Sequence, residues 1–323
     1  MKAAVLKQLG AAPVYTDMED PIPNGDDQVV MQVKAAAVKN IDKLRASGTH
    51  YASYKQLPVI VGIDGVGMLE DGRYVYSPGL TGMVAEKALV NKKRITPIPD
   101  GIDLATAAAL PNAVIGATMA LHRSKMKKGD VVLINGATGV TGQLAVQVAK
   151  HYGASKIIVT GRNTDVLNKL RDMGAHTLIS LKQEDNSIIS QLKEIHATAP
   201  IDIVIDYLWG HPIELIIKSL KGGGVDMFTH KVRIVTVGEM AGSSISLESG
   251  TLRSSDIEIM GSGLGSLSME DIQKFIGEVL PEMFNMAARG ELNIDTHTEQ
   301  LSDIETVWNK ELGSGKRLVI EIN

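Results

Sequence analysis

The feature that most constrains the fold is a regular alternation of apolar runs and amphipathic segments that begins at Val131. Runs of Ile, Val and Leu predict six short strands, at 131–135, 156–160, 177–180, 201–205, 234–237 and 257–260. Helices are predicted between them at 142–151, 164–173, 185–197 and 213–220. Because the strands show no polar alternation, each must be buried on both faces, as in a parallel sheet covered by helices. The segment is therefore predicted to be α/β, a doubly wound parallel six-stranded sheet.

Local signals mark the ends of two of these helices. Thr164 is the expected N-cap of the helix at 164–173, and Gly174 is its expected stop. Gly222-Gly223-Gly224 is expected to end the helix at 213–220.

A glycine-rich turn follows the first predicted strand and leads into the first helix. It consists of Gly136, Ala137, Thr138, Gly139, Val140, Thr141 and Gly142. Gly139 would let a pyrophosphate approach the backbone, and Gly142 would let the helix pack closely on the strand. The helix N-terminus adds N–H groups and a positive dipole end. Ala137 departs from the G-x-G-x-x-G pattern, and such turns also occur without ligands, but the strand–turn–helix–strand setting favours a dinucleotide.

The end of the second predicted strand indicates which dinucleotide is bound. An acidic residue there would accept hydrogen bonds from the ribose 2′-hydroxyl of NADH. This chain instead has Gly161, Arg162 and Asn163. A guanidinium in place of a carboxylate suits a 2′-phosphate, which predicts NADPH. The alternative is that Arg162 is only a surface arginine.

Composition excludes several classes of function. The chain has 323 residues, enough for two domains, and a net charge of −4, which does not indicate a nucleic-acid partner. It contains no cysteine, and its eight histidines form no metal-binding pair, so no disulfide, thiolate nucleophile or metal site is expected. No sufficiently long apolar run or signal peptide is found, so no membrane partner is expected and the cytoplasm is the expected location.

The sequence on either side of the alternating segment has a different pattern. Short apolar runs broken by Gly, Pro, Asn and Asp predict mostly antiparallel strands before residue 113. A helix at 104–124 interrupted by Pro111, a helix at 269–288 and a final strand at 317–322 are also predicted. The predicted domains are therefore a β-rich domain formed by 1–113 and 267–323, with the α/β domain of 114–266 inserted into it.

Several segments together resemble the medium-chain dehydrogenase/reductase superfamily, in its zinc-free quinone oxidoreductase (zeta-crystallin-like) branch. They are Met1–Ala3, Pro58–Gly67, Ala107–Pro111, the glycine-rich turn, Asp202–Asp206 and Gly315–Val319. The resemblance covers essentially the whole chain. It implies a Rossmann domain inserted into a GroES-like catalytic domain.

The resemblance also implies where the active site lies and how this chain departs from the family. Zinc dehydrogenases of the superfamily carry a Cys ligand where this chain has Lys39 and a His ligand where it has Ile63. The quinone reductases carry an active-site Asn that aligns with Lys39. Candidate catalytic residues are Lys39, Asn40, Asp42 and Tyr51, with Tyr54 also facing the nicotinamide.

The roles of these candidates remain open on the sequence alone. Lys39 either donates to a substrate oxygen or pairs with Asp42. Tyr51 either lines the cleft or covers apolar surface. Asp64, beside the lost zinc position, is expected to have a structural hydrogen-bonding role. Asp206 either faces the cofactor at its strand end or caps the next helix.

The implied activity is hydride transfer from NADPH to a small-molecule acceptor, a quinone or an α,β-unsaturated carbonyl. Because cofactors lie along the carboxyl ends of such strands, Gly238 and Ser262 are expected to flank its nicotinamide half. The family further implies a homodimer that pairs the edge strand at 255–260. Two alternatives are a CoA- or carrier-linked enoyl reductase, using Lys39, Lys43 and Arg45 for phosphates, and a non-catalytic NADPH-binding sensor.

Overall fold

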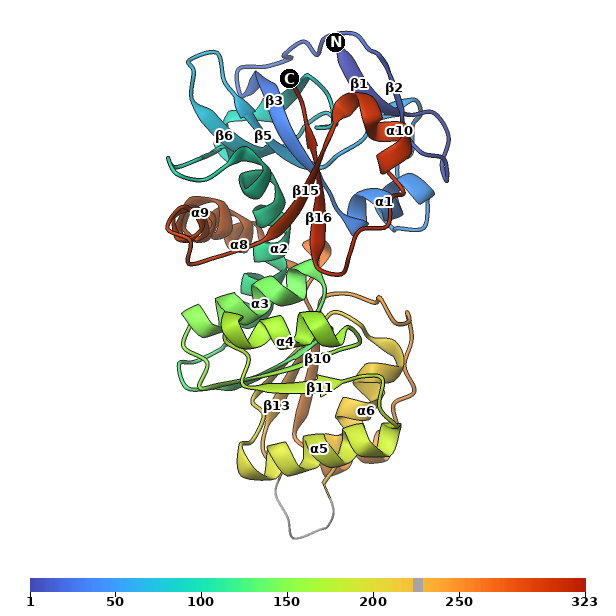
Figure 1. Cartoon of the computed structure of the whole chain (residues 1–323), viewed down its shortest axis with the longest axis vertical. Helices are drawn as coiled ribbons and strands as arrows, with labels where there is room; N and C mark the ends of the chain where they lie inside the picture. Colours follow the sequence, from blue (N-terminus) through green and yellow to red (C-terminus); the bar gives the residue numbers. More distant parts are fainter. Residues whose placement is uncertain (223–228) are drawn as a thin grey trace. The chain divides into compact units, whose positions relative to one another are not determined.

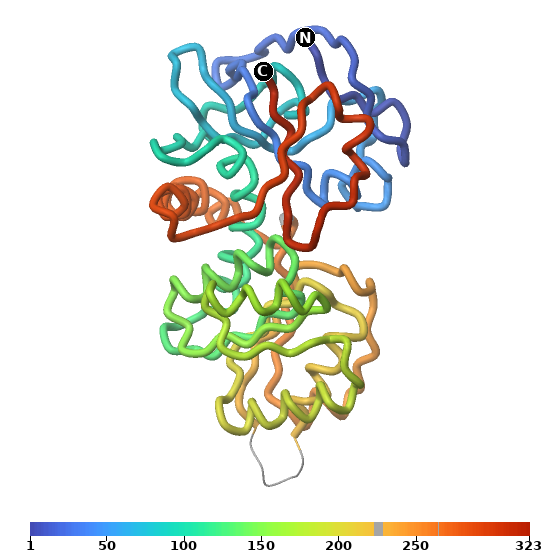
Figure 2. The backbone as a smooth tube through the Cα atoms, viewed as in Figure 1, coloured from blue at the N-terminus to red at the C-terminus, as the bar shows by residue number. Residues whose placement is uncertain are grey.

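The computed structural model describes residues 1–222 and 229–323. The chain divides into two compact units: Met1–Asn112 with Ile272–Asn323 form unit 1, and Ala113–Asp271 form unit 2. Both termini lie in unit 1, and the intervening chain forms unit 2 (Figure 2). Unit 2 is therefore inserted between two segments of unit 1.

The strands of unit 2 form one parallel sheet. They are β9 (Val131–Asn135), β10 (Lys156–Gly161), β11 (Thr177–Ser180), β12 (Ile203–Asp206), β13 (Val232–Thr236) and β14 (Ile257–Gly261). Among the described residues of this unit the strand order is β11-β10-β9-β12-β13-β14. This order confirms the predicted doubly wound six-stranded sheet. Its topological switch point, where ligands bind in such sheets, lies between β9 and β12.

Helices cover both faces of this sheet, whose central strands β9 and β12 are almost entirely apolar and buried. The helices of unit 2 are α3 (Val140–His151), α4 (Thr164–Met173), α5 (Asp185–Thr198), α6 (Gly210–Leu220) and α7 (Ser249–Ser254), with a 3₁₀ turn η2 at Leu264–Ser266. α3 and α4 lie on one face and α5 and α6 on the other (Figure 1). In β9, Val132, Leu133 and Ile134 are fully buried, as the double covering requires.

The helix caps differ from the prediction by one residue at α4. Asn163, not Thr164, is the N-cap, and its side chain accepts a hydrogen bond from the Val166 amide at 3.1 Å. Gly174 ends the helix with φ of 121°, as predicted. Of the three glycines expected to end α6, Gly223 and Gly224 lie outside the described residues.

Pro111 does not interrupt its helix, contrary to the prediction. α2 runs without a break from Leu104 to Arg123 with Pro111 inside it. Ala109 and Leu110 are fully buried there, so tertiary packing offsets the hydrogen bond that proline cannot donate. Among the described residues α2 also passes the length and hydropathy test for a membrane span, but 72% of its apolar window is buried, as in a core helix.

Unit 1 is built on two sheets. Their strands are β1 (Lys2–Leu6), β2 (Val14–Asp17), β3 (Gln28–Val38), β4 (Val59–Ile60), β5 (Asp64–Met68), β6 (Tyr74–Pro78), β7 (Lys87–Asn91), β8 (Thr96–Pro97), β15 (Asp295–Gln300) and β16 (Lys316–Glu321). Within residues 1–112 and 272–323, one sheet has the order β2-β1-β4 and the other β15-β16-β3-β5-β6-β8, with β7 also paired to β3. Most of these pairs are antiparallel, and β15 and β16 are parallel.

The remaining helical segments of the chain are short. They are α1 (Asn40–Ser47), α8 (Met269–Lys274), η3 (Phe275–Val279), α9 (Leu280–Ala288), α10 (Ile304–Val307), and the 3₁₀ turns η1 (Lys92–Arg94) and η4 (Leu301–Asp303). The single helix predicted at 269–288 is thus split by the π-helical turn η3, in which the Leu280 amide bonds the Phe275 carbonyl. Pro281 follows directly, and the wider turn accommodates its missing N–H.

The pairing of β16 with β3 places the two ends of the chain side by side. Leu318 lies opposite Val38 in an antiparallel register, so Arg317 comes next to Lys39. A candidate site residue from the first forty residues therefore has a neighbour from the last ten.

Candidate functional site

The glycine-rich turn of unit 2 has the backbone that a dinucleotide needs. Gly136 has φ of 88°, which favours glycine. A Cβ at Gly142 would lie 2.6 Å from the Ala137 Cα, so only glycine lets α3 pack this closely on the turn. A Cβ at Gly139 would meet only the Gly136 carbonyl oxygen, at 3.8 Å. The space in front of Gly139 is therefore open to a ligand.

The start of α3 adds hydrogen-bond donors to this turn. Gly139 is the N-cap, and the first amide to bond back to it is that of Gln143, at 3.0 Å. The amides of Val140, Thr141 and Gly142 precede the first intrahelical bond, so they are available to an anion. The residues present thus fit the pyrophosphate of a nicotinamide dinucleotide.

A chain of buried hydrogen bonds fixes the turn from below. Asp206, fully buried at the end of β12, accepts a hydrogen bond from Asn135 Nδ2 at 2.8 Å. Asn135 Oδ1 accepts from Thr160 Oγ1 at 2.6 Å, and Thr160 Oγ1 in turn accepts from the Gly136 amide at 3.2 Å. The carboxylate also accepts from the amides of Leu208 and Trp209, so Asp206 holds the turn that precedes α6. It does not take the expected capping role, because the N-cap of α6 is Trp209 and no side chain caps that helix.

The predicted 2′-phosphate residues lie at the carboxyl end of β10. Gly161 is buried, and a Cβ there would lie 2.4 Å from Thr138 Cγ2, so glycine is required for the two turns to meet. Arg162 is exposed and forms no ion pair with any described residue. The side-chain oxygen of Asn163 accepts the hydrogen bond that caps α4.

Gly238 and Ser262 follow β13 and β14 on the same edge of the sheet. The Gly238 amide bonds the Asp206 carbonyl at 3.3 Å, and the Ser262 amide bonds the Thr236 carbonyl at 2.8 Å. The structure therefore brings all predicted nucleotide-site residues to the carboxyl edge of the sheet.

In unit 1 the predicted catalytic lysine is buried in an ion cluster. Lys39 is 1% exposed. Its Nζ donates to the Ala37 carbonyl at 2.9 Å and to Asp64 Oδ1, and lies 3.3 Å from Asp42 Oδ2. An ammonium has three N–H donors, so each one has an acceptor within the protein. Of its two expected roles, Lys39 takes the ion-paired one.

Asp42 and Asp64 join this cluster to three backbone segments. Asp42 Oδ2 accepts from the Lys39 amide at 2.9 Å, and its Oδ1 accepts from the Ile63 amide at 3.1 Å. Asp64 Oδ2 accepts from the Tyr76 hydroxyl at 3.0 Å. The cluster thus cross-links the start of α1 to β5 and β6, and Asp64 has the structural role expected of it.

Arg317 completes the charge balance. It is 7% exposed, and Asp42 and Asp64 both attract its guanidinium, which partly offsets the lowering of its pKa by burial. Its Nε has no hydrogen-bond partner among the described residues. Two buried cations, Lys39 and Arg317, therefore face two buried carboxylates.

The pKa directions follow from this arrangement. Burial would lower the pKa of Lys39, but the carboxylates of Asp42 and Asp64 outweigh it and raise the pKa above its ordinary value. Burial raises the pKa of Asp42, against the attraction of Lys39. Burial and Asp64 place the pKa of Tyr76 well above its usual range. Lys39 and Tyr76 therefore hold their protons at neutral pH.

The other candidates lie nearer the surface of unit 1. Asn40 is exposed as the first residue of α1. Tyr51 is 78% exposed, with its ring 4.1 Å from that of His50, so it does not cover an apolar surface within unit 1. Tyr54 is half-buried, and the Arg45 guanidinium carbon lies 4.3 Å from its ring centre. In this part of the chain Asn40 is therefore exposed, whereas Lys39 is buried.

Sequence reasoning missed Tyr76, which donates to Asp64, and three further members of these networks. Asn135 and Thr160 stand at the ends of predicted strands, where a polar residue in an otherwise apolar run is a usable signal. Arg317 also lies within a strand, but nothing near it in the sequence indicates that its partners are Asp42 and Asp64.

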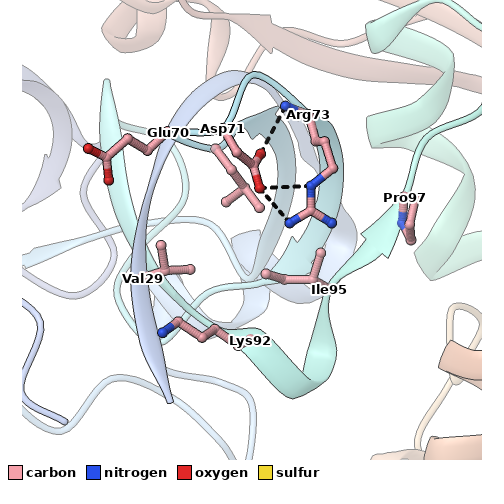
Figure 3. A pocket seen from close by; sticks show the side chains of 8 residues that line it. Val29, Glu70, Asp71, Arg73, Lys92, Ile95 and Pro97 are labelled. Atoms are coloured by element: carbon pink, nitrogen blue, oxygen red, sulfur yellow. Dashed lines mark hydrogen bonds and ion pairs between the residues drawn. The ribbon is translucent and has the colours of Figure 1, made fainter. Parts of the chain in front are cut away.

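A shallow pocket of about 560 Å³ lies elsewhere in unit 1 (Figure 3). It is lined by Val29, Leu69, Glu70, Asp71, Arg73, Lys92, Ile95 and Pro97. The Asp71–Arg73 ion pair at its rim is exposed to solvent. None of the predicted site residues lines this pocket.

Comparison with known proteins agrees with this geometry. Residues 140–280 match the zinc-binding dehydrogenase family. A probable NADPH-dependent quinone reductase of Emericella nidulans is 26% identical over 95% of this chain and 96% of its own length. An NADPH-dependent alkenal/one oxidoreductase of Arabidopsis thaliana chloroplasts is 33% identical over 62% of this chain and 54% of its own. The quinone oxidoreductase of Thermus thermophilus, also solved with NADPH, is 25% identical with a TM-score of 0.80, covering 99% of this chain and 100% of that one.

Together with these relatives, the parallel sheet of unit 2 and its open glycine-rich turn support an oxidoreductase that uses a nicotinamide cofactor. The family match, the relatives and the solved structures support the medium-chain dehydrogenase/reductase superfamily, in its quinone oxidoreductase-like branch. Its substrate is a small molecule.

Proposed function

We propose that this protein is an NADPH-dependent, zinc-independent reductase of quinones or α,β-unsaturated carbonyl compounds. The observation that carries the proposal is the exposed, unpaired Arg162 guanidinium that follows β10, beside the open Gly139 turn. A charge-assisted hydrogen bond to a 2′-phosphate contributes about 1.5–3 kcal/mol, or roughly ten- to hundredfold in affinity. The relatives named for NADPH-dependent quinone and alkenal reduction support this choice.

Zinc independence rests on the chemistry of the residues at the position of the superfamily's metal. An ammonium group, that of Lys39, lies between Asp42 and Asp64 and already satisfies both carboxylates. A zinc ion at this position would be repelled by Lys39 and Arg317. The chain has no cysteine to supply the usual ligand. These residues do not fit zinc.

The absence of a Lewis acid limits the acceptor to one that is already electrophilic. A quinone or an enone meets this requirement because conjugation activates the carbon that receives hydride, whereas a simple ketone needs polarisation. The bound nicotinamide supplies the hydride from its C4.

Residues of unit 1 then orient the acceptor and stabilise charge on its oxygen. Asn40 presents a neutral amide donor at the start of α1, where the helix dipole also favours negative charge. Lys39 and Asp42 hold the backbone of this turn in place through the capping bond between them. Lys39 is thus a positioning residue and Asn40 the donor.

The carrier-linked alternative lacks the basic patch it requires. Lys39 is buried in ion pairs, and Arg45 covers Tyr54 and donates to the Ala52 carbonyl at 3.0 Å. Of the three cations expected to bind phosphates, only Lys43 remains.

We also propose that the protein forms a homodimer through β14. This strand is the last in its sheet among the described residues, and its Ile257 and Ile259 are half-buried. Pairing with a second copy would cover this edge. Light scattering at micromolar concentration should give the dimer mass, and a monomer mass would contradict this assignment.

The test of the proposed function is steady-state oxidation of NADPH and NADH with 1,4-benzoquinone, phenanthrenequinone and a simple enone. The wild type should turn over with NADPH and prefer it to NADH. Arg162→Ala should lose most of that preference, whereas Lys169→Ala, an exposed cation in α4, serves as the charge-matched control. An equal fall with both cofactors in Arg162→Ala would refute the assignment. Tight NADPH binding without turnover of any acceptor would favour the sensor.

A further inference from the structure

We propose that Asp206 is a positioning residue for the dinucleotide, holding the turn after β12 against the glycine-rich turn after β9. The inference rests on dinucleotide binding by unit 2 and not on the identity of the acceptor. Its basis is the buried chain of hydrogen bonds that joins the two turns.

The turn after β12 has a strained backbone. Trp209 has φ of 54° and ψ of −158°, a combination that residues other than glycine adopt only when the surroundings force it. Its amide donates to the Asp206 carboxylate at 3.1 Å, and the Leu208 amide donates to the same group, also at 3.1 Å. Asp206 therefore supplies the bonds that offset this strain. Strained positions of this kind cluster at functional sites.

The strained turn contacts the glycine-rich turn directly. A Cβ at Gly136 would lie 2.8 Å from Leu208 Cγ, so the Leu208 side chain sits on the Gly136 backbone. This contact spans β9 and β12, the two strands on either side of the switch point. A shift of Leu208 would move the backbone that faces the pyrophosphate.

The same carboxylate reaches Gly136 by a second route. Asp206 accepts from Asn135, Asn135 accepts from Thr160, and Thr160 accepts from the Gly136 amide. Each of the three side chains is fully buried. Burial raises the pKa of Asp206, but every partner of its carboxylate is an N–H donor, as the ionised form requires.

The direction of the hydrogen bonds makes the network testable by replacing Asp206 with asparagine. Asp206 Oδ1 accepts from Asn135 and Leu208, and Oδ2 accepts from Trp209. If the new amide oxygen keeps the Oδ1 position, the NH₂ group at the Oδ2 position opposes the Trp209 amide. In the opposite orientation the NH₂ group opposes the donors of Asn135 and Leu208. Either orientation therefore places an N–H group against a buried N–H donor, and the negative charge that held all of these donors is lost.

The experiment is a titration of each full-length variant with NADPH and with NADH, followed by nicotinamide fluorescence, together with Tm and kcat at saturating cofactor. Asp206→Asn should weaken both cofactors equally, by roughly ten- to hundredfold, and leave kcat within about threefold. Asp202→Asn is the matched control, since Asp202 lies just before β12 at its other end and also accepts an amide hydrogen bond, from Val131 at 2.7 Å.

Thr160→Val provides a second route if Asp206→Asn does not fold. It removes the hydroxyl that links Asn135 to the Gly136 amide and should weaken the binding of both cofactors, whereas Thr160→Ser keeps this hydroxyl and should not. Wild-type affinity in Asp206→Asn or Thr160→Val would overturn the inference and leave the proposed function intact. So would equal losses in Asp206→Asn and Asp202→Asn. Failure of the wild type to bind either cofactor would overturn both.

Discussion

Replacing Lys39 with methionine tests whether its buried ammonium organises unit 1 or serves the substrate. The change keeps a long side chain and removes the three N–H donors that bond Ala37, Asp42 and Asp64. Asp64 then keeps its hydrogen bond from the Tyr76 hydroxyl but loses its ammonium partner, and Arg317 is left as the buried cation facing two carboxylates. Breaking a buried pair in this way costs about 3–5 kcal/mol. Since a domain is stable by about 5–15 kcal/mol, the loss should be large.

The assay uses the fact that each unit contains one of the chain's two tryptophans. Trp308 is 3% exposed in the core of unit 1, and Trp209 lies in unit 2. In a Trp209→Phe background, urea unfolding followed by fluorescence reports on unit 1 alone. Lys39→Met should shift its midpoint strongly to lower urea.

A double variant separates loss of the ion pair from loss of packing. Lys39→Met/Asp64→Asn removes one of the uncompensated charges and should be more stable than the sum of the two single losses predicts. Loss of less than about 1 kcal/mol in Lys39→Met, or strict additivity of the two changes, would refute the reasoning. Loss of kcat with unchanged stability would instead make Lys39 a donor to the substrate.

Three further predictions follow from the contacts described. Gly139→Ala should leave Tm unchanged and weaken cofactor binding about tenfold or more, because its Cβ meets almost nothing but the open space before the turn. Gly142→Ala should instead lower Tm, because its Cβ meets backbone at 2.6 Å. A fall in Tm for Gly139→Ala, measured by thermal unfolding, would contradict the first expectation. Asn163→Ala should cost about 1 kcal/mol in urea unfolding through loss of the α4 cap, and an unchanged midpoint would argue against that cap. His196 Nδ1 accepts a hydrogen bond from the Ile201 amide, and burial, helped by His230, lowers the His196 pKa below its ordinary 6.5. The unfolded chain therefore binds more protons, so stability should fall as pH drops below about 6.5. His196→Asn, which can still accept the bond, should flatten that fall in urea unfolding between about pH 7.5 and 5.5, and an unaltered pH dependence would exclude His196 as its source.

The sheet of unit 2 was predictable because its signals are local. β9 and β11 have the bounds that the sequence predicts. β9 is buried along its whole length, and such a strand admits few polar residues. The course of α2 was not predictable, because the penalty at Pro111 is local whereas the burial that offsets it arises from the rest of the unit. The φ of Trp209 had no signal either, since tryptophan gives no indication of a glycine-like conformation.

The candidate site also contains residues that local sequence signals predict and residues that only contacts between distant segments bring together. Gly139, Gly142 and Arg162 were found because the dinucleotide turn and the following strand end have a fixed spacing in sequence. The partners of Lys39 were only partly found: Asp42 lies one helical turn away, whereas Asp64 and Arg317 reach it through strand pairing. Periodicity predicts which strands exist but not the register that brings distant charges together.

The insertion of unit 2 also sets the order in which a growing chain can fold. Every strand of the parallel sheet has been synthesised once the ribosome passes residue 261, so unit 2 can close while synthesis continues. Unit 1 cannot close then, because β16 occupies residues 316–321 and is synthesised after unit 2. Until that moment β3 lacks the neighbour it pairs with from Ala35 to Val38, and Lys39 lacks Arg317 beside it. A nascent chain therefore carries an open strand edge through most of its synthesis, the interval in which it is most exposed to aggregation and most in need of chaperones.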